Sequence, residues 1–298
     1  MGRGPEKCTN ILRKDLRGLG YGFIIELAIM KPAKKEGKLM DREQYTRYNA
    51  EQWDQWVEDG IEWGIPISHE AYLAAKNGTW DVYLTPMRPV PHSWFPELKG
   101  AQLLGLASGG AQQMPVFAAL GANCTVFDYS QKQLESERMV AEREGYSIQI
   151  VRGDMTKPLP FPDGQFDVIF HPVSNCYIED VYQVWRECYR ILKPGGVLLA
   201  GMDNGIPYLF NDDQTLVVEN ALPFNPLKNP EQCEKLMRDG DGMQFSHSLE
   251  EQIGGQLKAG LRLTDLFDDR DRPGQGRLRD FTPTYIATRA IKPEKEGI

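Results

Sequence analysis

The stretch that decides the fold is Leu104-Gly-Leu-Ala-Ser-Gly-Gly-Ala-Gln-Gln113, a run of small residues that follows a short apolar segment. Small residues let a chain turn sharply and let a ligand approach the backbone closely. The run therefore predicts a ligand-binding loop between a strand and a helix. It does not name the ligand, because a helix N-terminus suits a carboxylate and a phosphate about equally well.

Around this loop the pattern is that of an α/β domain. From residue 101, short apolar runs alternate with helical periods, as in repeated βαβ units that build a mainly parallel sheet. We expect a helix from a capping box of Ser130 and Gln133 towards Glu144, and further helices over 181–192 and 249–259. The strands that we expect are 102–106, 124–127, 148–151, 166–170 and 197–200, with closing strands near 261–267 and 285–290.

Two acidic residues follow expected strands. Asp128 comes after the second strand, where a carboxylate can accept both hydroxyls of an adenosine ribose, and Tyr129 beside it can pack on the adenine. Arg152-Gly-Asp-Met155 follows the third strand and brings Asp154 within reach of an adenine amino group. An ordinary turn residue is the alternative at both positions.

Two further stretches make the pattern specific. Residues 158–170 predict a turn that leads into a buried strand, and Ile191-Leu-Lys-Pro-Gly-Gly-Val-Leu-Leu199 predicts a helix, a tight turn and a strand. With them, the spaced set G-L-A-S-G-G, F-D-Y-S, R-G-D-M, F-D-V-I-F and L-K-P-G-G resembles the class I S-adenosylmethionine-dependent methyltransferases. The strong resemblance covers about one third of the chain.

The resemblance implies a Rossmann-like, seven-stranded, mostly parallel sheet with an antiparallel last strand, flanked by helices, and S-adenosylmethionine as the cofactor. It also implies that the first loop surrounds the methionine, Asp128 the ribose, and Asp154 with Met155 the adenine. The full set of cofactor-binding residues that we expect is Asn49, Trp53, Leu106, Ala107, Ser108, Gly109, Gln113, Asp128, Tyr129, Gly153, Asp154, Met155 and His171.

The first loop departs from the family pattern. Gly105 stands where family members commonly place an acidic residue, and Ala107 and Ala111 replace two of the loop glycines. We therefore expect other groups to hold the methionine ammonium. The candidates are Asn49, Trp53 and Asp54 from the N-terminal segment, and Gln112 and Gln113 from the loop.

The acceptor side is expected after the fourth strand, in His171-Pro-Val-Ser-Asn-Cys-Tyr177, because the carboxyl ends of parallel strands face the ligand crevice. His171, Asn175 and Tyr177 are the expected catalytic residues. His171 can take a proton near neutral pH, and a hydrogen-bonded packing histidine is the alternative. His247, and Asn204 with Tyr208, are weaker candidates. Methyl transfer depends mainly on positioning, so a strong base is optional.

The chain divides by composition. Residues 1–39 are basic, and we expect a disordered or non-native leader, with Met40 as the biological start. Residues 40–100 hold five of the six tryptophans and predict a helical, aromatic cap. Residues 101–290 are the expected catalytic domain, in which the irregular insertion 204–247 covers the substrate, and 291–298 are a tail.

Charge and cysteines narrow the function. The net charge is −8 although residues 1–39 hold nine Lys/Arg and four Asp/Glu, so the rest of the chain is acidic, which disfavours a nucleic-acid partner. Glu26 interrupts the longest early apolar run, so we expect no membrane span and a cytoplasmic location. The five cysteines form no C-x-x-C pair, and we expect reduced thiols and no metal site.

These observations favour a methyltransferase with a small-molecule acceptor, because aromatic density suggests an enclosed, partly apolar pocket. Three alternatives stay open. A nicotinamide-dependent oxidoreductase would need G-x-G-x-x-G, which Gly105, Gly109 and Gly110 do not match. The others are a tRNA- or protein-modifying methyltransferase and a non-catalytic regulator that binds S-adenosylmethionine. The sequence does not indicate the oligomeric state.

Overall fold

The computed structural model describes residues 40–211 and 214–294, so the expected leader 1–39 and the residues 295–298 of the tail lie outside the described residues. The helices are α1 (Arg42–Glu58), α2 (His69–Lys76), α3 (Met114–Ala119), α4 (Gln131–Glu144), α5 (Tyr182–Ile191), α6 (Pro230–Asp239) and α7 (Leu249–Lys258). The strands are β1 (Gln102–Leu106), β2 (Asn123–Asp128), β3 (Gln149–Arg152), β4 (Phe166–His171), β5 (Leu192–Asp203), β6 (Arg262–Asp269) and β7 (Tyr285–Ile291). Within the described ranges, no helix is both long and apolar enough to cross a bilayer.

The seven strands form one sheet in the order β3-β2-β1-β4-β5-β7-β6. Strands β1 to β5 pair in parallel, and β7 runs antiparallel to both of its neighbours. The expected Rossmann-like sheet with an antiparallel last strand is confirmed. Strand β5 starts earlier than expected, because Leu192 already pairs with Phe166 and the Lys-Pro-Gly-Gly turn becomes an irregularity in the register.

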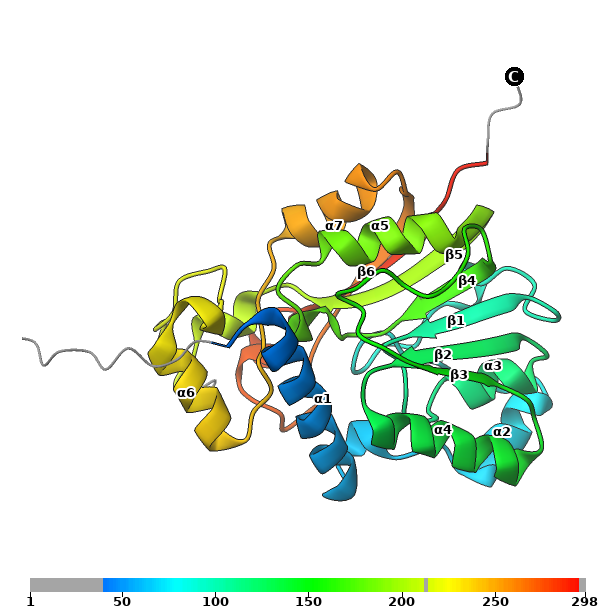
Figure 1. The fold of residues 1–298 in the computed structure, drawn as a ribbon, viewed down its shortest axis with the longest axis horizontal. Coiled ribbons are helices and arrows are strands. Elements are labelled where there is room, and N and C mark those ends of the chain that lie inside the picture. The colour runs from blue at the N-terminus through cyan, green and yellow to red at the C-terminus, as the bar shows by residue number, and fades with distance from the viewer. Residues whose placement is uncertain (1–39, 212–213, 295–298) are drawn as a thin grey trace, which may run out of the picture. The chain divides into compact units, whose positions relative to one another are not determined.

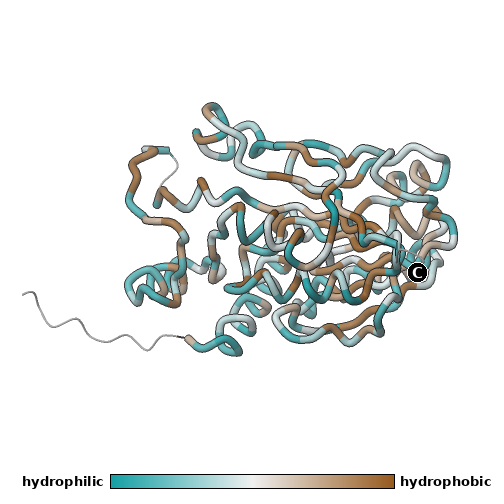
Figure 2. Tube along the Cα trace, turned by 90° about the horizontal axis from the view of Figure 1, so that it is seen from above, coloured by the Kyte–Doolittle hydropathy of each residue, from teal (hydrophilic) through white to brown (hydrophobic). Residues whose placement is uncertain are grey.

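The sheet is the middle of three layers. Helices α5 and α7 cover one face, and α2, α3 and α4 lie on the other (Figure 1). Trp185 and Leu198 belong to the core between the sheet and the first pair of helices, whereas Phe117 and Val126 belong to the core on the opposite face. The hydrophobic segments gather in the interior around the strands (Figure 2). This is the arrangement expected when a sheet is buried on both faces.

Part of the N-terminal cap packs on the same face of the sheet as α3. Its irregular stretch adds Val82, Leu84 and Trp94 to the same core as α3. A Cβ on Gly201 of β5 would lie 2.0 Å from the carbonyl oxygen of Leu84, so only glycine lets the two backbones approach this closely. Residues 61–100 therefore complete the fold as well as bordering the site.

The insertion 204–247 is less irregular than expected, because it contains α6. Asn229 caps this helix by accepting from the N–H groups of Glu231 and Gln232, Pro230 is its first residue, and Gly240 ends it at φ 73°. These are ordinary helix start and stop signals that the sequence carries. Tyr45 of α1 packs with Cys233 and Phe245 in a small, separate hydrophobic core. This core attaches α1 to the insertion.

Candidate functional site

The loop after β1 is pressed against β2 and α4. A Cβ on Gly109 would lie 2.7 Å from Cβ of Gln133, and a Cβ on Gly110 would lie 2.4 Å from Oε1 of Gln133. Ala107 has a φ of 47°, a left-handed conformation that glycine would adopt with less strain. Packing therefore requires glycine at 109, and a φ of 98° requires it at 110. The loop borders open space on its other side.

Asp128 ends β2 next to this loop. Its Oδ2 accepts from the N–H of Gly109 at 2.9 Å and its Oδ1 accepts from the N–H of Ser130 at 3.0 Å. Burial raises the pKa of this carboxyl above its usual value, and the backbone N–H groups of Gly109, Ser130 and Tyr129 act against that rise. Because a carboxylate can accept about four hydrogen bonds, the group keeps capacity for a donor from a ligand.

Asp154 presents an oxygen without a partner. Its Oδ1 accepts from the backbone N–H of Thr156 at 2.9 Å and from its hydroxyl at 2.8 Å. Its Oδ2 is buried and has no hydrogen-bond partner among the described residues. A Cβ on the neighbouring Gly153 would lie 2.5 Å from the ring of Phe127, so the chain before Asp154 is packed tightly. A buried acceptor of this kind calls for a donor from a ligand.

These groups border a cavity of about 990 Å³. Among the expected cofactor-binding residues, those that line it are Asn49, Trp53, Ala107, Ser108, Gly109, Gln113, Asp128, Tyr129, Gly153, Asp154 and Met155. Leu106 and His171 do not. Leu106 is fully buried in the core below the loop, so its side chain has no access to the cavity.

Comparison with known proteins decides the family. The profile described as a methyltransferase domain matches residues 104–200. The uncharacterized methyltransferase YbaJ of Bacillus subtilis is 43% identical over 251 residues, which cover 82% of this chain and 97% of that protein. This chain belongs to the class I methyltransferases.

Two further proteins are similar to parts of this chain. A demethylmenaquinone methyltransferase of Listeria monocytogenes is 34% identical over 113 residues, 37% of this chain and 47% of that protein. The fold matches a solved S-adenosylmethionine-dependent methyltransferase from Mesorhizobium loti with a TM-score of 0.52 at 17% identity, over 67% of this chain and 94% of that one.

His171 does not line the cavity. It is fully buried, with Nδ1 2.9 Å from the carbonyl oxygen of Leu106 and Nε2 2.9 Å from Oδ1 of Asn175. Burial lowers the pKa of the imidazole, which favours the neutral ring. Asn175 is also fully buried, does not line the cavity, and donates to Oε1 of Gln252 on α7 at 2.9 Å. This placement argues against the expected catalytic roles of both residues and supports the packing alternative.

Tyr177, the third expected catalytic residue, does line the cavity. Its ring packs edge-on against Trp53 of α1, with 5.6 Å between the ring centroids. Burial raises the pKa of the phenol well above its usual value, so Tyr177 stays protonated. The buried network of His171 and Asn175 therefore supports the loop that carries Tyr177. His247 also packs, with Nε2 2.9 Å from the carbonyl oxygen of Ile178.

The cap candidates have structural partners. Asn49 donates to the carbonyl oxygens of Tyr177 and Met243, both at 3.0 Å, and accepts from the N–H of Met243 at 2.7 Å. Asp54 accepts from the hydroxyl of Ser130 at 2.6 Å and from the N–H of Lys132 at 2.9 Å. Both side chains dock α1 beside the site, and a contact of Asn49 with the cofactor stays a prediction.

The missing acid at Gly105 has a steric explanation. A Cβ there would lie 2.6 Å from Sδ of Met114, so Met114 fills the space that an acidic side chain would need. Of the loop candidates, Gln112 donates to the carbonyl oxygens of Glu62 and Ile65, both at 3.1 Å. Gln113 lines the cavity, and its Oε1 lies 3.4 Å from the hydroxyl of Ser108.

Sequence reasoning missed Asp203, the last residue of β5. It is 4% exposed and lines the cavity. Asp128 was found because it ends a parallel strand, and the same rule applied to Leu198-Leu-Ala-Gly-Met-Asp203 would have found this carboxyl as well.

Proposed function

We propose that this methyltransferase binds S-adenosylmethionine in the cavity and transfers its methyl group to a small-molecule acceptor. The observation that carries the proposal is the unpartnered Oδ2 of Asp154, one crossover along the sheet from Asp128. An adenosine offers a ribose diol to the first carboxyl and an amino group to the second.

The chemistry of the reaction lies in the cofactor, because a sulfonium supplies an already activated methyl group. The protein then has to bind, orient and exclude water. Asp128 holds the ribose in a fixed position because its own oxygens are set by the N–H groups of Gly109 and Ser130. Trp53 and Tyr177 form an aromatic part of the cavity wall, which would limit the access of water to the bound cofactor.

A small acceptor agrees with the cavity. Its volume of about 990 Å³ is at the upper end of the roughly 300–1,000 Å³ of ordinary ligand pockets, which leaves room for a cofactor and an acceptor together. Seven carboxyl groups and two basic side chains line it, which opposes the phosphates of an RNA substrate. The seven are Glu62, Asp81, Asp128, Asp154, Asp203, Asp241 and Asp271.

Titration calorimetry tests the cofactor. We expect the protein to bind S-adenosylmethionine and not NAD. In Asp154→Asn, Thr156 keeps Oδ1 in place, so the amide nitrogen takes the position of Oδ2 and meets the adenine amino group donor to donor. The affinity should fall about 10- to 100-fold, the effect of one lost acceptor.

Asp268→Asn is the matched control, since Asp268 is an exposed carboxyl on β6 that does not line the cavity. Its affinity for S-adenosylmethionine should equal that of the unchanged protein. Equal affinity of all three proteins, or binding of NAD in place of S-adenosylmethionine, would refute the proposal.

A further inference from the structure

Asp203 carries a buried oxygen with no partner. Its Oδ1 accepts from the N–H of Gly205 at 2.9 Å, whereas its Oδ2 is buried and unpaired among the described residues. The side chain lies in the cavity wall. A buried carboxylate oxygen without a donor is destabilising, so the missing donor is expected from a ligand.

Two neighbouring phenols, those of Tyr208 and Tyr285, already bond elsewhere. The hydroxyl of Tyr208 donates to Oε1 of Gln244 at 3.0 Å. Tyr285 is the register partner of Asp203 on β7, and its phenol hydrogen-bonds Asp271. The geometry therefore leaves Oδ2 of Asp203 as the open acceptor in this part of the cavity.

The position of Asp203 separates it from the cofactor region. In the sheet order, β4 lies between β1 and β5. With neighbouring strands about 4.8 Å apart, Asp203 is roughly 10 Å along the sheet from the loop after β1. Asp128 and Asp154 lie on the opposite side of that loop, at the ends of β2 and β3. Asp203 is thus on the side that the adenosine does not use.

The surroundings indicate the class of acceptor. Tyr208 and Phe224 stack with ring centroids 5.6 Å apart, and with Tyr177 and Tyr285 they make this region aromatic. The carboxyl groups of the wall outnumber its basic side chains, Lys235 and Arg272, which disfavours a carboxylate or phosphate acceptor. An amine is disfavoured for another reason: an acidic wall stabilises its protonated form, which has no lone pair to attack the methyl group. A neutral aromatic compound with a hydroxyl group fits these conditions.

We propose that Asp203 is the acceptor-binding residue of this methyltransferase, and that its Oδ2 accepts the hydroxyl hydrogen of a neutral, phenol-like acceptor. The inference rests on the proposed function. In the reaction, the acceptor oxygen forms a bond to the methyl carbon, the carbon–sulfur bond breaks with its electron pair going to sulfur, and the hydroxyl proton passes to Asp203. Charge balances, because the sulfonium is neutralised as the carboxylate is protonated.

The carboxyl is suited to that proton transfer. Burial raises the pKa of Asp203 to about 6, so it is mainly ionised at neutral pH and a stronger base than an ordinary aspartate. The backbone donors, chiefly Gly205, limit the rise.

Binding of two probes tests the proposal without turnover. 2-Naphthol and 2-methoxynaphthalene share the same ring system, but the ether carries a methyl group in place of the hydroxyl hydrogen and so has no donor; both are fluorescent. With S-adenosylhomocysteine saturating the protein, we expect 2-naphthol to bind about tenfold or more tightly than its methyl ether, as for a hydrogen bond to a charged group. In Asp203→Asn, Gly205 holds Oδ1, so an amide N–H replaces Oδ2. This N–H can donate to the oxygen of either probe, so the preference for 2-naphthol should disappear.

Asp241→Asn is the control, since Asp241 is a carboxyl of the same wall contributed by the insertion, and it should keep the preference. A preference that survives in Asp203→Asn, or a wild-type protein that binds both probes equally or neither, would overturn the proposal. Failure to bind S-adenosylhomocysteine at all would instead refute the proposed function, so the two failures are distinguishable.

Discussion

Glu137 is a buried carboxyl that contacts the loop after β1. It is fully buried on α4, and its Oε1 accepts from the N–H of Ala111 in the first loop at 2.7 Å. Its Oε2 has no partner among the described residues. Burial raises the pKa of Glu137 from 4.5 to about 8, and the charge of Asp128 contributes to the rise. This carboxyl therefore supports the cofactor loop in its protonated form.

A pH dependence of stability follows. Between pH 4.5 and about 8 the folded protein holds a proton on Glu137 that the unfolded chain has lost. The contribution is complete below pH 4.5 and is lost as the pH rises through about 8, at a cost on the order of a few kcal/mol. In Glu137→Gln this part of the slope should be absent.

Thermal unfolding at several pH values measures the effect. The melting temperature of the unchanged protein should fall more steeply between about pH 5 and 8 than that of Glu137→Gln. Glu142→Gln is the control, since Glu142 is an exposed carboxyl of the same helix. A change at Gln133 would not serve as a control, because Gln133 touches the loop. Parallel curves for Glu137→Gln and the unchanged protein would show that Glu137 titrates normally.

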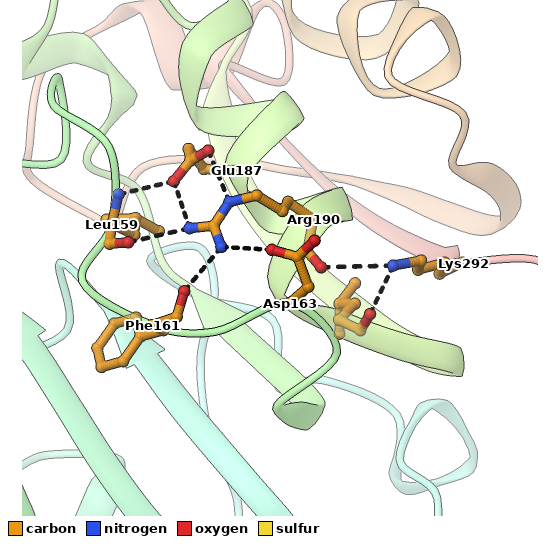
Figure 3. A network of polar contacts seen from close by, with 7 residues as sticks. Leu159, Phe161, Asp163, Glu187, Arg190 and Lys292 are labelled. Carbon is orange, nitrogen blue, oxygen red and sulfur yellow. Dashed lines mark hydrogen bonds and ion pairs between the residues drawn. The ribbon is translucent and has the colours of Figure 1, made fainter.

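At the scale of elements, α5 is tied to the loop before β4 by one guanidinium (Figure 3). All five N–H groups of Arg190 have acceptors. They are Oε1 and Oε2 of Glu187 at 3.0 and 2.7 Å, Oδ1 of Asp163 at 2.8 Å, and the carbonyl oxygens of Phe161 and Leu159 at 2.7 and 2.9 Å. The bond to Arg190 is the main cause that lowers the pKa of Glu187.

Arg190→Lys should destabilise the fold and leave the site intact. A lysine has three donors on a single atom, so at least two of the five acceptors lose their bond. We expect the free energy of unfolding to fall by about 2–3 kcal/mol, with unchanged affinity for S-adenosylmethionine.

Chemical denaturation measures the loss, and Arg186→Lys is the control. Arg186 is an exposed arginine of the same helix that donates to Oε1 of Gln183 at 2.9 Å. Equal midpoints for Arg190→Lys and Arg186→Lys would show that the network does not hold α5.

Elements with a local signal could be predicted from the sequence. Strands β1 to β4 and helices α4 and α7 carry apolar periods and caps, and the structure has them within about two residues of the expected bounds. Of the predicted capping box, the structure shows the bond from the N–H of Gln133 to Ser130. Helix α6 was missed although its capping residues and an apolar stripe of Cys233, Leu236 and Met237 were present, because the Asn, Pro and Asp residues around it were taken as the sign of an irregular segment.

The cofactor side of the site was more predictable than the acceptor side. Asp128 and Asp154 follow strands that the sequence reveals. Asn175, which bonds His171, also bonds Gln252 of α7, 77 residues further along the chain. Contacts of this kind have no local signal, so position after a strand could not distinguish a cavity residue from a buried one.

At the scale of the whole described part, helix α1 connects the insertion and α4, which both border the site. Its N-terminal half packs with the insertion through Tyr45 and Asn49, and its C-terminal half reaches α4 through Asp54. Helix α1 lies between α6 and α4 in Figure 1. The cavity is therefore enclosed by segments that are far apart in the sequence, which explains why its acceptor side could not be assembled from motifs.

A crystal structure with S-adenosylhomocysteine tests the central claim most directly. The account predicts that the ribose hydroxyls lie within hydrogen-bonding distance of the Asp128 carboxylate and the adenine amino group within that distance of Oδ2 of Asp154. A nucleoside bound elsewhere, with Oδ2 of Asp154 still unpartnered, would contradict it.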